Sequence, residues 1–119
     1  MASPQKHKQK YESNKQILDK LLREKRKPND WLVTIAFYSA LHLVDKTIVE
    51  SSGEAHKPMD HTDRDLKVTR LTELKHIRTY YKALYMASRK SRYECVSITD
   101  KERENNLQYL SEIEKELNK

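Results

Sequence analysis

Hydrophobic positions repeat at helical spacing along most of this chain. The longest apolar run, Trp31–Val44, contains no Gly or Pro. Its polar interruptions are Thr34, Ser39 and His42. Because apolar residues fall on nearly every face of the implied helix, the run predicts a helix that is buried on all sides. We expect this central helix to span about Asp30–Ser51. Asn29 or Asp30 would cap its N-terminus, and Gly53 would end it in left-handed geometry.

An amphipathic helix is predicted before the central helix. Ser3 can cap it, and Pro4 would occupy the first helical position. Apolar residues then recur at three- and four-residue spacing on an otherwise highly charged segment, which predicts one buried stripe. The helix should end before Pro28, which disfavours helical geometry in the preceding residue. Residues 1–6 are expected to fray.

The segment after the central helix predicts a second long helical region. A polar connection covers residues 53–61, and Asp60 or Thr62 would cap the helix that follows. The helical pattern then continues without Gly or Pro to about Cys95. A helix of that length would exceed every other one in the chain, so we expect a break near Arg70–Lys75.

The end of the chain predicts a final amphipathic helix. Thr99 and Glu102 are spaced as a capping box, and an apolar stripe at helical spacing follows them. β-branched alternation is absent, and one Gly and three Pro leave little material for hairpins. Four or five helices with short connections pack most economically as an up-and-down bundle. The predicted fold is therefore all-α, a four- to five-helix up-and-down bundle forming one domain over residues 1–119.

The composition fits one small domain in a reducing compartment. The chain has 119 residues, of which 36% are hydrophobic, and this allows one modest core. Cys95, the single cysteine, cannot form an internal disulfide. No signal peptide is recognised, and Trp31–Val44 is too short and too interrupted to span a bilayer. These features predict a cytoplasmic protein that is not associated with a membrane.

The net charge of +6 is unevenly distributed. Residues 1–28 contain nine Lys/Arg against three Asp/Glu, and residues 63–95 are also basic, whereas the segments 29–62 and 96–119 are acidic. One interpretation is that basic helices lie beside acidic ones, so that the charges cancel at short range. The other is a basic face that binds RNA, DNA or another polyanion.

Several polar residues could form a site. His42 shares a predicted helix face with Tyr38 and Asp45, either as a hydrogen-bonded structural group or as part of a site. Four potential ligands cluster in and after the polar connection: His56, Asp60, His61 and Asp63. Their spacing fits no established zinc pattern, so we expect neither a metal nor another cofactor. Tyr80, Tyr81 and Tyr85 are expected to pack in the core rather than to stack on bases.

Two groups of residues could bind an anion. His61 and Arg64 lie three apart at a predicted helix N-terminus, where an anion would be favoured. Arg89 is adjacent in helical register to Arg92, with Tyr85 and Tyr93 four residues before and after Arg89. Such a group can bind phosphate and stack on a base. Alternatively, both arginines pair with acidic residues of the central or the last helix.

These segments together resemble the HEPN superfamily of small prokaryotic helical domains. The resemblance rests on AFYSALHLVD at residues 36–45, HTDR at 61–64, Tyr80 with Leu84, and SRKSRY at 88–93. It covers roughly Trp31–Tyr93 and implies a four- or five-helix up-and-down bundle, usually a homodimer. Many members are toxins, antiphage factors or RNA-processing proteins, often encoded beside a minimal nucleotidyltransferase.

The resemblance also implies a possible catalytic pair. Active members are metal-independent endoribonucleases in which an Arg precedes a His by four to six intervening residues, and Arg70 with His76 has this spacing. In that role His76 would act as general acid/base, and Arg70 would stabilise the pentavalent phosphate. The residue after the Arg is commonly polar in the family, often Asn, but here it is Leu71.

These observations support three functional hypotheses. The first is a binding module for RNA, a nucleotide or a partner protein, in which one anion-binding groove is lined by His42, His61, Arg64, Arg89 and Tyr93. The second is an endoribonuclease that uses Arg70 and His76. The third is a non-catalytic structural partner, such as an antitoxin or the companion of a nucleotidyltransferase.

Overall fold

The computed structural model describes residues 3–53, 58–94 and 96–118, and within these ranges the chain is entirely helical apart from its connections. The elements are α1 (Pro4–Leu22), α2 (Asn29–Ser52), α3 (His61–Arg70), the short 3₁₀ helix η2 (Thr72–Leu74), α4 (Arg78–Tyr93) and α5 (Asp100–Leu117). The described residues contain no strand. The predicted all-α bundle is confirmed.

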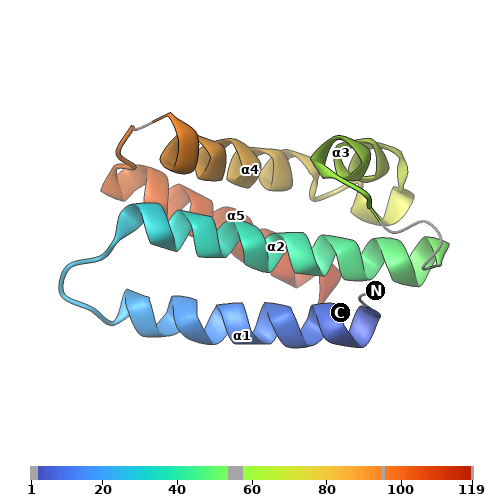
Figure 1. Cartoon of the computed structure of the whole chain (residues 1–119), viewed down its shortest axis with the longest axis horizontal. Coiled ribbons are helices and arrows are strands. Elements are labelled where there is room, and N and C mark those ends of the chain that lie inside the picture. Colours follow the sequence, from blue (N-terminus) through green and yellow to red (C-terminus); the bar gives the residue numbers. More distant parts are fainter. Residues whose placement is uncertain (1–2, 54–57, 95, 119) are drawn as a thin grey trace.

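Four long helices run alternately in opposite directions, with α2 at the centre (Figure 1). α1 packs along one side of α2, and α4 lies along the other side, while α5 contacts both α2 and α4. The short helix α3 sits at the end of the bundle, beyond the start of α4 and over the C-terminal part of α2 (Figure 1). The α1–α2 connection therefore lies at the same end of the molecule as the C-terminus of α4.

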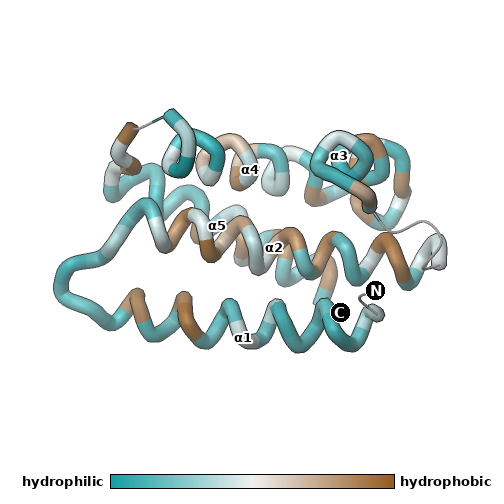
Figure 2. The backbone as a smooth tube through the Cα atoms, viewed as in Figure 1, coloured by the Kyte–Doolittle hydropathy of each residue, from teal (hydrophilic) through white to brown (hydrophobic). Residues whose placement is uncertain are grey.

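The core is built around α2, as its apolar pattern predicts. Side chains on several faces of this helix are buried, including Leu32, Phe37, Leu43 and Ile48, whereas α1 buries only Leu18 completely. Hydrophobic colour accordingly concentrates on α2, and the α1–α2 connection is hydrophilic (Figure 2).

α2 is longer than the apolar run inside it. By length and composition alone it could cross a membrane, and 72% of its most apolar window is buried inside the bundle. Core helices of globular proteins have the same properties, so the helix does not distinguish the two environments.

Most predicted helix ends are confirmed, and one is wrong. Ser3 and Asp60 each accept a hydrogen bond from a backbone N–H of the first turn, and Thr99 forms the capping box. Gly53 ends α2 with φ 85°. The N-cap of α2, however, is Pro28, and both expected caps, Asn29 and Asp30, are already helical. The Asn29 side chain instead donates hydrogen bonds to the Ile98 carbonyl and the Asp100 carboxylate, which tie α2 to the start of α5.

The predicted break in the long helical region is confirmed. α3 ends at Arg70, and Leu71 has extended geometry with φ −76° and ψ 127°. The buried Leu74 and Ile77 follow, so the chain leaves the helix where its apolar side chains turn towards the core. The other end of this region, Cys95, lies outside the described residues. At the start of the chain α1 begins at Pro4, so residues 4–6, which were expected to fray, are helical.

Candidate functional site

A row of surface pockets follows the length of α4. The central pocket is lined by His61, Tyr85, Arg89, Arg92 and Tyr93. It shares His61 and Tyr85 with a pocket towards α3, and it shares Arg92 with a pocket towards the start of α2. We call the last of these the Trp31 pocket; its lining residues are Asp30, Trp31, Thr34, Ser91 and Arg92.

Arg92 is held in place by aromatic side chains. Its Nη1 donates a hydrogen bond to the Tyr38 hydroxyl at 2.9 Å. The guanidinium carbon lies 5.5 Å from the ring centroid of Tyr38 and 4.9 Å from that of Tyr93, within the range of cation–π attraction. This packing orients the guanidinium without neutralising its charge.

Arg89 lies one helical turn before Tyr93 and has similar surroundings. Its guanidinium carbon lies 6.0 Å from the Tyr93 ring centroid, and its Nη1 lies 3.4 Å from the Tyr85 hydroxyl, which accepts the hydrogen bond. Arg89 is exposed, and so is Tyr93, with an exposed fraction of 66%.

Among the described residues, neither arginine forms an ion pair with a carboxylate. The cation of α4 that does so is Lys90, whose Nζ lies 2.9 Å from Glu102 on α5. Of the two alternatives that the sequence left open, pairing of Arg89 and Arg92 with acidic residues of α2 or α5 does not occur in the described chain. Both positive charges face the central pocket.

Arg64, in contrast, forms an ion pair with a carboxylate. Its guanidinium makes a bidentate contact with Asp45 of α2 at 2.6 and 2.9 Å, and the two side chains are only 11% and 6% exposed. Burial alone would lower the pKa of Arg64, but the hydrogen bonds to Asp45 outweigh it and raise the pKa. The expected capture of an anion by His61 and Arg64 together is thus not supported, because Asp45 already occupies the guanidinium.

His61 is the link between this ion pair and the pocket. Its Nδ1 lies 3.3 Å from Nη1 of Arg64, and its ring centroid lies 5.3 Å from that of Tyr85. Burial, followed by the positive charges of Arg64 and Arg92, lowers the pKa of His61. The imidazole is therefore neutral at neutral pH.

His42 lies away from the pockets, at the interface with α1. Its Nδ1 is 3.0 Å from Nδ1 of His7, so one ring must donate and the other accept. Burial and the neighbouring His7 lower the pKa of His42 to about 4. The predicted groove thus contains His61, Arg89 and Tyr93, but His42 does not line it. The partner His7 was missed, because 35 residues separate the pair and only the packing of α1 on α2 brings them together.

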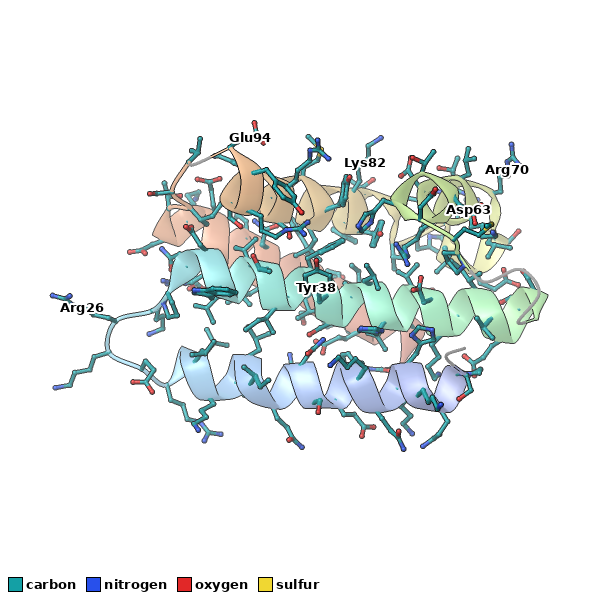
Figure 3. The ribbon with its side chains drawn as sticks, viewed as in Figure 1. Arg26, Tyr38, Asp63, Arg70, Lys82 and Glu94 are labelled. Atoms are coloured by element: carbon teal, nitrogen blue, oxygen red, sulfur yellow. The ribbon has the colours of Figure 1, made fainter. Side chains whose placement is uncertain are left out.

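The candidate catalytic residues lie at the α3–η2–α4 junction. Arg70 is the last residue of α3, and His76 lies in the turn between η2 and α4. Both are exposed, and the side chain of Arg70 points away from the bundle (Figure 3). Neither lines the row of pockets along α4.

Within the described ranges, no group of three or more His, Cys, Asp or Glu side chains is arranged to hold a metal ion; His56 lies outside these ranges.

Trp31 was expected to be buried with the rest of its run, but it is 66% exposed. The next residues of the same turn, Leu32 and Val33, are fully buried, so the exposure of Trp31 follows from the direction of its side chain at the start of α2.

Neither protein-family models nor curated proteins nor solved structures give a match to this chain. The resemblance to the HEPN superfamily therefore stays a prediction.

Proposed function

We propose that this protein binds RNA, and that the central pocket holds a phosphate group beside a stacked base. The observation that carries the proposal is the pair Arg89 and Arg92, whose positive charges have no carboxylate partner among the described residues and are framed by tyrosines.

The chemistry of the pocket suits this ligand. A guanidinium binds phosphate through paired charge-assisted N–H···O bonds, which are the stronger class of protein hydrogen bonds. Arg92 is already oriented by Tyr38, so less side-chain freedom is lost when it binds. Tyr93 is largely exposed, and one face of such a ring is a platform on which a base of any kind can stack.

The neighbouring ion pair supports the pocket rather than binding the ligand. The Asp45–Arg64 contact fixes α3 on α2 and thereby places His61 against Tyr85. A neutral His61 can donate one hydrogen bond to a phosphate or sugar oxygen. Because it is uncharged, it holds no counter-ion that the ligand would have to displace.

The test compares two double variants by fluorescence anisotropy with a labelled single-stranded RNA. Arg89→Ala/Arg92→Ala is expected to weaken binding by at least about tenfold, since each charge-assisted hydrogen bond contributes roughly 1.5–3 kcal/mol. It should also reduce the dependence of log K on log[salt] by about one for each phosphate contact removed.

The matched control is Lys75→Ala/Lys115→Ala, which removes two exposed positive charges outside the pockets along α4. It should keep most of the affinity. Equal losses in the two variants would show that net charge alone attracts RNA, and the proposed pocket would then be wrong.

A further inference from the structure

The Trp31 pocket adjoins the central pocket but has different chemistry. Trp31 presents a large, exposed ring, and the hydroxyl groups of Thr34 and Ser91 line the same pocket. The two pockets meet at Arg92, which lines both of them. Arg92 therefore connects a pocket that contains Tyr93 with a pocket that contains Trp31.

Asp30 determines which part of a ligand the Trp31 pocket can hold. One of its carboxylate oxygens accepts a hydrogen bond from the Ile98 N–H at 3.0 Å, so the side chain is held at the pocket. A carboxylate repels phosphate but accepts hydrogen bonds from the amino group of a base. The pocket suits a base, and the phosphate belongs on the Arg92 side.

A basic segment lies immediately before Trp31 in the chain. The α1–α2 connection contains four exposed cations: Arg23, Lys25, Arg26 and Lys27. Within the described residues none of them forms an ion pair. This connection lies at the end of the bundle where α4 finishes, and Arg26 extends from it into solvent (Figure 3).

From this arrangement we infer that the ligand is a single strand of several nucleotides, whose bases occupy the central pocket and the Trp31 pocket and whose backbone continues onto the α1–α2 connection. The inference rests on the proposed function of the central pocket. Aromatic surfaces that alternate with cations match the alternation of bases and phosphates along a strand. A mononucleotide would use only the first part of this path.

Trp31 is the single tryptophan of the chain, so its fluorescence reports on the second pocket directly. The experiment titrates the full-length protein with a mononucleotide, a trinucleotide and a hexanucleotide of the same base. The hexanucleotide should bind at least about tenfold more tightly than the mononucleotide and quench Trp31, because one further stacked base contributes roughly 1–3 kcal/mol.

Two variants separate the parts of the path. Trp31→Ala should remove most of the gain in affinity between mononucleotide and hexanucleotide. Lys25→Gln/Arg26→Gln/Lys27→Gln should make the hexanucleotide's binding less dependent on salt. The matched control Lys6→Gln/Lys8→Gln/Lys10→Gln removes the same charge from the opposite end of α1 and should keep both the gain in affinity and the salt dependence of the unchanged protein.

The outcomes distinguish the two proposals. The mononucleotide could bind through Arg89 and Arg92 while the hexanucleotide binds no tighter. This result would contradict the proposal of a single-stranded ligand and would support binding in the central pocket. The proposed path is also wrong if the hexanucleotide binds tightly while Trp31 is not quenched. It is equally wrong if the control triple variant reduces the salt dependence as much as the Lys25/Arg26/Lys27 variant does. If no nucleotide of any length binds, both proposals are overturned.

Discussion

Three polar side chains in the middle of α2 each meet a different neighbouring helix. Tyr38 accepts a hydrogen bond from Arg92 of α4, His42 meets His7 of α1, and Asp45 binds Arg64 of α3. Of the two alternatives for His42, the hydrogen-bonded structural group fits the contact with His7, and each of the three residues has its own partner. At the scale of single residues, these three side chains therefore connect α2 to α4, α1 and α3.

The His7–His42 contact predicts a pH-dependent stability. Burial lowers the pKa of His42 from 6.5 to about 4 in the folded protein, so between these values the unfolded chain binds more protons than the folded one. Stability should therefore be full above the unfolded pKa and fall as the pH drops through this interval. After discounting for partial exposure, the loss should be about 1 kcal/mol, since one pKa unit corresponds to about 1.4 kcal/mol.

The measurement is chemical denaturation above and within that interval, with His42→Gln as the non-titrating variant. Its free energy of unfolding should depend less on pH than that of the unchanged protein. Parallel pH profiles for the two proteins would contradict the assignment.

Arg70 and His76 allow a second prediction at this scale, which the HEPN resemblance motivates. Both side chains are accessible to a large substrate. If they are catalytic, purified protein should cleave RNA without added metal and leave 2′,3′-cyclic phosphate ends, and His76→Ala should lower the rate at least about a hundredfold. Cleavage that continues unchanged in His76→Ala would exclude this pair, and absence of cleavage by the unchanged protein would contradict the endoribonuclease hypothesis.

Among the elements, α3 is held to the bundle mainly by polar contacts. It is short, and Val68 is its one fully buried side chain. The Asp45–Arg64 contact and the hydrogen bond from Arg78 Nε to the Val68 carbonyl attach it to α2 and α4. Isolated helices of this length are marginal in water, so α3 persists because of these tertiary contacts.

Breaking the ion pair should therefore loosen α3. Asp45→Ala leaves a buried guanidinium without its counter-ion, and such changes typically cost about 3–5 kcal/mol of folding free energy. Urea denaturation measures the loss, and hydrogen exchange should rise most in α3. The double change Asp45→Leu/Arg64→Met removes both charges and should recover much of the stability; a double variant as unstable as Asp45→Ala would mean that the pair contributes net attraction instead.

At the scale of the whole molecule, basic helices are partly neutralised by an acidic neighbour. Lys15 of α1 pairs with Glu114 of α5 at 3.2 Å, the same carboxylate accepts a hydrogen bond from Tyr11, and Lys90 of α4 pairs with Glu102. The first interpretation of the charge pattern, cancellation between neighbouring helices, thus holds where α1 and α4 face α5. The central pocket and the α1–α2 connection stay basic, and binding of a polyanion there stays a prediction.

The homodimer implied by the HEPN resemblance is a prediction that belongs to this scale. One chain has a Cα radius of gyration of 13.9 Å. A compact dimer of this size should have a radius of about 18 Å, from the scaling of radius with chain length. Small-angle scattering over a range of concentrations measures the value. A radius that stays near that of one chain at every concentration would show that the protein is a monomer.

Much of the fold was predictable from the order of residues alone. The helices follow from apolar spacing, and their ends follow from local chemistry: the Thr99–Glu102 capping box, the Gly53 stop and the Asp60 cap all involve atoms a few residues apart. The break after Arg70 was also accessible, because no other helix in the chain approaches the length that an unbroken one would have. Part of the site was visible in the same way, since Arg89 and Tyr93 lie one turn apart on one helix.

What only the tertiary structure decided is which of these groups meet. A carboxylate on α2 took Arg64 out of the predicted anion site and left Arg89 and Arg92 without an acidic partner in the described chain. Likewise, His42 turned towards His7, and Trp31 stayed exposed beside Arg92. Sequence spacing determines helices and their faces because those interactions are local. The partner of a charged or polar side chain depends on long-range packing, which brings together groups that lie far apart along the chain.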